Sequence, residues 1–129
     1  MKRLIAAGIL LAAVMAAYIS SLMYITKTCD KTKELILRCE EAYSEGEAYK
    51  YAEELSSLWD EKEKALSFFM NHNRIDDIEL EISSLLLYSE TEDEILFYEH
   101  IETLKMLLHQ VKEDTRKSVH SIFKWININ

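Results

Sequence analysis

The sequence predicts an all-α protein in which an N-terminal transmembrane helix is followed by a small antiparallel bundle of three to four helices. Three observations support this prediction. The 129 residues include no proline and only two glycines, whereas β-sandwiches and barrels need many Gly- and Pro-rich turns. Residues 4–25 contain no charged side chain. After them, apolar residues recur at alternating spacings of three and four, which is typical of helices that pack at shallow angles.

The uncharged stretch is long enough to cross a bilayer. Its 22 residues would rise by about 33 Å as a helix, against roughly 30 Å of hydrocarbon. Tyr18 and Tyr24 lie in its C-terminal part, where aromatic rings favour the membrane interface. A cleaved signal peptide is the competing interpretation, but the apolar run continues past the small residues expected at a cleavage site. We therefore expect residues 1–26 to be a retained signal anchor that contacts the lipid bilayer through residues 4–25.

Charge is distributed unevenly after the anchor. Residues 40–102 contain 19 acids and four bases, whereas residues 105–129 contain five bases and two acids. A net charge of −8 argues against binding to the phosphates of nucleic acids. We interpret the acidic stretch as a solvated face, with an acidic docking surface as the alternative. An anchor directly after Met-Lys-Arg is typical of a signal anchor, so we expect the remainder of the chain outside the cytoplasm.

Three polar breaks divide the rest of the chain into four expected helices. Gly46, the only glycine after the anchor, marks the first break. Each break carries a capping signal, namely Ser44 with Glu47, Asn73 with Asp76, and Thr91 with Glu94. The expected helices cover residues 28–45, 47–71, 74–89 and 92–120.

Apolar stripes on these helices indicate how they pack. The second helix has a broad stripe that includes Leu55 and Trp59. The third and fourth have stripes with 3-4 alternation, formed by Ile75, Ile78, Ile82 and Leu85 and by Phe97, Ile101, Leu104, Leu108 and Val111. Because each stripe lasts only two or three heptads, a compact antiparallel bundle is favoured over a long coiled coil. We expect the bundle to occupy residues 27–123 and a short apolar tail residues 124–129.

Few residues are candidates for a catalytic or metal-binding site. His72 lies four residues before Asp76, and His109 four before Glu113, so each pair shares a helix face. A transition-metal site needs three or four converging ligands, so we interpret both pairs as helix-stabilising and expect no metal or cofactor. If His72 is buried, it is expected to fix the bend between two helices. The sequence has no phosphate-binding loop and no nucleophile elbow, and we expect no enzymatic activity.

The cysteines and the tail have alternative interpretations. Cys29 and Cys39 are ten residues apart, about 15 Å along a helix, so they cannot pair within one continuous helix. Cys39 is expected in the core, and Cys29 is either a free thiol or a bridge to a second chain. The tail is unusually apolar. Phe123 and Trp125 are expected either to pack against the end of the bundle or to lie among lipid headgroups.

With these landmarks, the chain resembles a bacterial family of short, single-span, membrane-anchored helical proteins known only as a domain of unknown function. The resemblance covers nearly the whole chain. It rests on Trp59, His72-Asn73-Arg74-Ile75-Asp76, Ile78, Ile82, Leu104-Lys105 and Ser121-Ile122-Phe123. Arg74 and Ser121 depart from the family pattern, in which an acid and an asparagine are expected at these places. The resemblance implies an anchored helical module and no established activity.

Two classes of function fit these observations best. The first is a non-enzymatic protein-interaction or scaffold module at the outer face of a bacterial membrane, with an unknown protein partner or a second copy of the chain. The second is an extracytoplasmic ligand-binding or sensor domain with a pocket between helices near Trp59, His72 and Tyr88. A metal protein or enzyme built on the His–acid pairs is a third. A scaffold should have a filled core and an exposed apolar strip, whereas a sensor should have an aromatic-lined pocket.

Overall fold

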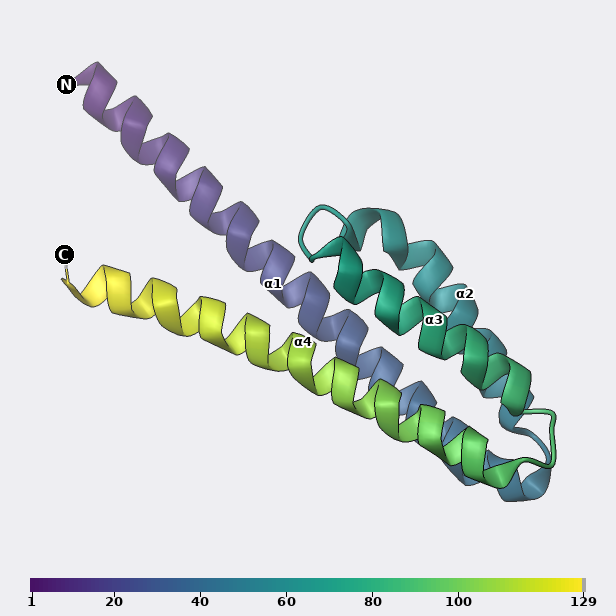
Figure 1. Ribbon diagram of the computed structural model, residues 1–129. Coiled ribbons are helices and arrows are strands. Elements are labelled where there is room, and N and C mark those ends of the chain that lie inside the picture. The colour runs from purple at the N-terminus through teal and green to yellow at the C-terminus, as the bar shows by residue number, and fades with distance from the viewer. Residues whose placement is uncertain (129) are drawn as a thin grey trace.

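The computed structural model describes residues 1–128 and contains four α-helices and one short 3-10 helix (Figure 1). The elements are α1 (Lys2–Ala42), η1 (Tyr43–Glu45), α2 (Ala48–Leu66), α3 (His72–Tyr88) and α4 (Glu94–Ile128). Over the described residues the chain forms no β-strand. The predicted all-α class is therefore confirmed.

Helix α1 joins the expected anchor to the bundle without a break. The sequence predicts an anchor to residue 26 and a separate helix over 28–45, but α1 is one helix of 41 residues. No glycine or proline between Gly8 and Gly46 interrupts its backbone hydrogen bonds. Three threonines of α1 also form hydrogen bonds within the helix. The hydroxyls of Thr26, Thr28 and Thr32 each donate to the carbonyl four residues earlier, at 2.7–3.0 Å.

The first half of α1 is a candidate membrane span. It is long and apolar enough to cross a bilayer, and only 6% of its most apolar stretch is buried within the protein. From Ser21 onwards, one face of α1 is buried and belongs to the bundle. The same helix is thus exposed and apolar at its N-terminal end and part of the core at its C-terminal end.

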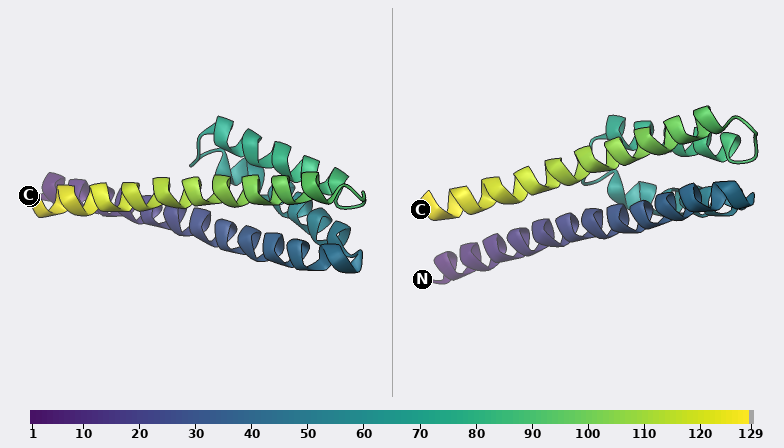
Figure 2. Two further views of the ribbon diagram at one scale, coloured as in Figure 1. Left: turned by 60° about the horizontal axis from the view of Figure 1, so that its bottom comes forward. Right: turned by 90° about the horizontal axis from the view of Figure 1, so that it is seen from below.

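Helices α1 and α4 are antiparallel and extend well beyond the shorter pair formed by α2 and α3 (Figures 1 and 2). All four helices therefore share only one half of the molecule, where α1 packs on α2 and α4, and α3 packs on α2 and α4. We call the end with the 43–47 and 89–93 turns the distal pole. Helix α4 continues to Ile128, past the expected end at residue 120, so residues 124–128 of the expected tail are helical, and residue 129 lies outside the described residues.

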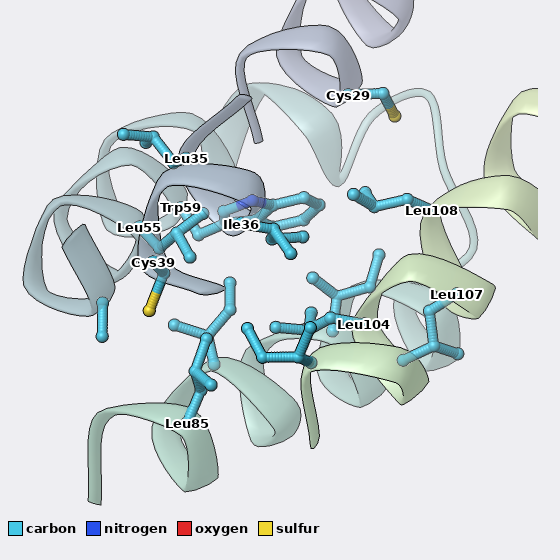
Figure 3. Packing of buried hydrophobic residues seen from close by; sticks show 14 of the residues in the cluster. Cys29, Leu35, Ile36, Cys39, Leu55, Trp59, Leu85, Leu104, Leu107 and Leu108 are labelled. Carbon is cyan, nitrogen blue, oxygen red and sulfur yellow. The ribbon is translucent and has the colours of Figure 1, made fainter. Parts of the chain in front are cut away.

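The core is continuous through the four-helix half and is filled by side chains from every α-helix (Figure 3). Trp59 lies at its centre with 1% of its surface exposed, and its indole Nε1 donates a 3.0 Å hydrogen bond to Thr32 Oγ1. The predicted stripes of α3 and α4 are buried over their full length. In the stripe of α2, Ala48, Ala52, Leu55, Trp59 and Leu66 are buried, whereas Phe69, beyond the end of the helix, is half-exposed.

The helix boundaries differ from the predicted caps. Asn71, not Asn73, caps α3, because its extended backbone lets its side chain accept the Asn73 N–H at 2.9 Å. Asp93, not Thr91, caps α4, accepting the Leu96 N–H at 3.2 Å. In the first turn, the Ser44 hydroxyl donates to the Glu41 carbonyl instead of completing a capping box with Glu47. Gly46 does end this turn, in the left-handed conformation.

Replacing Gly46 with alanine is expected to destabilise the bundle by about 1 kcal/mol. The φ of Gly46 is +75°, which disfavours any residue with a Cβ, while a Cβ placed there meets no atom within 4 Å. The loss of stability therefore comes from the backbone conformation and not from a steric clash. It should be smaller for Gly46→Asn, since asparagine tolerates this conformation. Hydrogen exchange of the bundle amides in nanodiscs measures the free energy of opening. Equal losses for the two variants would contradict this explanation.

Candidate functional site

The residues expected to form a sensor pocket lie apart. Trp59 is enclosed in the core, whereas His72 is exposed at the first residue of α3. Tyr88 is the last residue of the same helix, about 24 Å away along its axis. Tyr88 stacks on His100 of α4 with ring centroids 5.3 Å apart. These three side chains therefore line no common cavity, and His72 is too exposed to fix the bend by burial.

The histidine with a close acidic partner is one that the sequence did not single out. His100 Nδ1 of α4 lies 2.6 Å from Glu81 Oε2 of α3, and both side chains are largely buried. Its partner is on another helix, so no spacing within one helix could have indicated it. His72 and Asp76 are both exposed. Within residues 1–128, no three His, Cys, Asp or Glu side chains converge where they could hold a metal ion.

Carboxylates of α2 and α3 crowd around Glu79. Burial raises the pKa of Glu79 above its ordinary value of 4.5, and the nearby carboxylates of Glu63, Asp76 and Asp60 raise it further. Its Oε1 atom is buried and has no hydrogen-bond partner among the described residues. Ionisation of Glu79 is therefore less favourable in the folded protein than in the unfolded chain.

Glu79→Gln is expected to stabilise the bundle at neutral pH by on the order of 1 kcal/mol. Because the folded-state pKa of Glu79 is raised, the folded state binds its proton more tightly than the unfolded state does. Stability is thus lost as the pH rises above about 4.5. Glutamine removes this loss, so the difference between variant and wild type should shrink towards zero below about pH 4. Hydrogen exchange at several pH values measures this difference.

The matched control for this prediction is Glu53→Gln on α2. Glu53 is exposed, so the variant removes one negative charge without relieving burial. It should change the free energy of opening by much less than Glu79→Gln does. An equal gain from both variants would attribute the effect to net charge and contradict the role of the buried carboxylate.

Both cysteines are buried in α1 and point into the bundle (Figure 3). Burial raises the pKa of the Cys29 thiol to about 11 and that of Cys39 to about 12. Cys39 Sγ also donates to the Ala48 carbonyl at 3.4 Å, as expected for a core residue. Cys29 is 1% exposed, so a bridge to a second chain would require the core to open. Both are unreactive thiols in the folded protein.

The distal pole brings two acidic turns together. Residues 40–47 contain four acids and residues 90–94 contain four more, with no base in either segment. The hydroxyl of Tyr43 donates to the Thr91 carbonyl at 2.9 Å, and its ring stacks on Phe97 at 4.1 Å. Both turns line one open depression of about 730 Å³. Ile95 is highly exposed immediately after the second turn.

The opposite end of the four-helix half contains a mixed polar and apolar cavity of about 510 Å³ between α1, the 67–71 turn, α3 and α4. Tyr24 and Phe69 meet edge to face on one side of it, with ring centroids 6.4 Å apart. Arg74 lies on the other side and bonds to Gln110 and, at 3.2 Å, to Asp114. This cavity lies beside the C-terminal end of the candidate span.

Side chains near the end of α4 lie beside α1. Trp125 is 62% exposed and shares a groove with Met15 and Tyr18, on the part of α4 that extends beyond α2 and α3. Phe123 is similarly exposed. The expectation that these side chains pack against the end of the bundle is therefore wrong, because α4 does not end there.

A family model described as a domain of unknown function, DUF4363, matches residues 19–122 of the chain. The chain belongs to this family. The resemblance to a domain of unknown function is thereby confirmed. No curated protein and no solved structure matches the chain.

The DUF4363 match covers all four helices of the bundle and the last seven residues of the uncharged stretch. Of the residues that suggested the resemblance, Trp59 forms the centre of the core and Ile75, Ile78 and Ile82 are buried beside it. Arg74, a departure from the expected pattern, joins α3 to α4 through Asp114. The buried residues of this set thus pack the helices together, whereas His72, Asp76 and Phe123 are exposed.

Proposed function

We propose that this protein is a non-enzymatic scaffold, anchored in a bacterial membrane by residues 4–25, that presents its acidic distal pole to a protein partner at the outer face. The observation that carries this proposal is the continuity of α1. The same helix contains the candidate span and contributes core residues such as Ile36 and Cys39. The bundle is therefore held at a fixed height and orientation, and not on a flexible linker.

The length of α1 sets the distance between the proposed membrane surface and the distal pole. Residues 25–42 of α1 extend for about 25 Å beyond the uncharged stretch. The five acids of the 43–47 and 89–93 turns are thus held well away from the lipid. Such a height suits contact with another protein better than contact with the bilayer.

The chemistry of the pole defines the kind of partner. Glu90, Glu92 and Glu94 line the open depression, and Ile95 offers an exposed apolar side chain next to them. A complementary segment would place an apolar side chain on Ile95 and basic side chains around it. Its association should weaken as salt screens the acids.

Photocrosslinking tests the partner surface. A photoreactive amino acid replaces Ile95 in the full chain in its native membrane, and a matched variant carries it at Leu80, another exposed apolar position, on the side of α3. We expect a discrete adduct from position 95 whose yield falls at high salt and in the Glu90→Lys, Glu92→Lys double variant. An equal adduct from both positions, or none from position 95, would overturn the proposed surface.

Cysteine labelling tests the side of the membrane. Glu53→Cys places a reactive thiol on an exposed part of α2, while the buried native cysteines remain unreactive. A membrane-impermeant maleimide should label this variant in intact cells. Lys2→Cys, on the other side of the span, should be labelled only after the cells are permeabilised. The opposite pattern would overturn the proposed orientation.

A further inference from the structure

The C-terminal turns of α4 lie alongside the candidate span. Ile122 and Ile126 line an apolar groove of about 690 Å³ together with Met15 and Ile19 of α1. The right-hand view in Figure 2 shows both helices continuing side by side past the end of the α2–α3 pair. The end of α4 is therefore held against the C-terminal half of the uncharged stretch.

The register between the two helices sets the depth of α4. Met15 lies ten residues inside Ile25, or about 15 Å along the helix, which is half of a hydrocarbon core of roughly 30 Å. A bilayer that covers residues 4–25 must therefore also reach the residues of α4 that lie beside Met15. Exposed side chains on that part of α4 face lipid.

The side chains on the end of α4 suit that environment. Phe123, Trp125 and Ile126 are exposed to a degree that is unusual for large apolar residues in water. Tryptophan favours the membrane interface, and a single lysine, Lys124, can extend towards the headgroups. Residues 115–128 contain three bases and no acid, which favours anionic lipid, whereas the distal pole is acidic.

The turn between α2 and α3 provides another contact at the same end. Phe68 is 78% exposed and Phe69 is half-exposed, next to Tyr24 at the edge of the uncharged stretch. Phe68 and Tyr18 line the same cavity. Aromatic residues from two segments that are distant in sequence therefore gather where α1 leaves the expected bilayer.

We propose that residues 119–127 of α4 and the Phe68–Phe69 turn enter the same leaflet that α1 crosses, the turn at the level of the headgroups and the end of α4 deeper, among the acyl chains beside Met15. The occupant of the exposed apolar surface is lipid. The protein thus has one spanning contact and two partly inserted ones. This inference rests on the proposed anchoring of α1, but it is independent of the partner at the distal pole.

Depth-dependent fluorescence quenching tests the inference on the full chain. The protein is reconstituted into vesicles of phosphatidylcholine and phosphatidylglycerol with brominated acyl chains, which quench nearby tryptophans. Trp59 is enclosed in the core, so quenching should come from Trp125 and disappear in the Trp125→Phe variant. In that background, Phe68→Trp should restore quenching by bromine placed close to the headgroups. Both substituted positions are exposed, so neither change should unfold the bundle.

A separate tryptophan is needed to report whether residues 4–25 lie in the bilayer. With it, failure of the proposed anchoring can be distinguished from failure of the inference about α4. Tyr18→Trp in the Trp125→Phe background places a tryptophan in the uncharged stretch. If that variant is quenched while Trp125 is not, and aqueous acrylamide quenches Trp125 instead, the inference is overturned and the anchor stands. If Trp125 is shielded from both bromine and acrylamide, a second copy covers it and the inference is again overturned. If the Tyr18→Trp variant is not quenched, the proposed anchoring fails as well.

Discussion

Replacing Trp59 with alanine is expected to reduce the stability of the bundle by about 3–5 kcal/mol, the largest loss from any single truncation in this core. The indole is fully buried among side chains of all four α-helices, so its removal leaves a cavity that no single helix can close. Small domains have a total stability of about 5–15 kcal/mol, and this change would bring the bundle close to unfolding. Hydrogen exchange in nanodiscs should show bundle amides losing protection while the amides of the candidate span keep it.

The chain offers a matched control in its other tryptophan. Trp125→Ala removes the same side chain from an exposed position and should leave the free energy of bundle opening nearly unchanged. Thr32→Val retains the shape of its side chain but leaves the buried Trp59 Nε1–H without its acceptor, at a cost of about 1–3 kcal/mol. Similar losses for Trp59→Ala and Trp125→Ala would contradict the assignment of Trp59 as the central core residue.

Lys33→Pro is expected to destabilise the bundle by about 3 kcal/mol or more. Lys33 is exposed in the middle of the part of α1 that belongs to the bundle, so its side chain contributes little. Proline removes the backbone N–H of residue 33 and clashes with the carbonyl of Cys29. The resulting kink would separate Ile36 and Cys39 from the rest of the core. Amide exchange should rise on both sides of residue 33.

The control for the proline variant is Lys33→Ala, which removes the same charge and keeps the helix straight. It should change the stability by no more than a few tenths of a kcal/mol. If alanine destabilises the bundle as much as proline, the effect comes from the lysine side chain and not from the continuity of α1.

The sequence contains enough information to predict the helices and the faces that they bury. The 3-4 spacing of apolar residues identified the core of α3 and α4, because burial in a bundle follows the helical period closely. The turn at Gly46 was predictable because few other residues accept a positive φ. The choice between Asn71 and Asn73 as the cap of α3 was not, since either side chain can accept a backbone N–H.

What the sequence could not indicate were contacts that depend on the register between helices. Trp59 and Thr32 are 27 residues apart, and their hydrogen bond follows only from how α2 lies on α1. The pairs of His100 with Glu81 and of Arg74 with Asp114 have the same origin. The sequence changes from apolar to charged near residue 26, which suggested a helix boundary. This change alters the surroundings of α1 but not its backbone hydrogen bonds, so the helix continues.

With residues 4–25 anchored in the bilayer as proposed, the unbroken α1 would make the bundle move rigidly with the span. Transmembrane helices tilt by about 20° on average, and they tilt further when the bilayer is thinner than their apolar stretch. With an arm of about 25 Å, a tilt of roughly 20° would move the acidic turns sideways by roughly 9 Å. Thickening or thinning of the surrounding lipid would therefore shift the position from which this protein meets its neighbours.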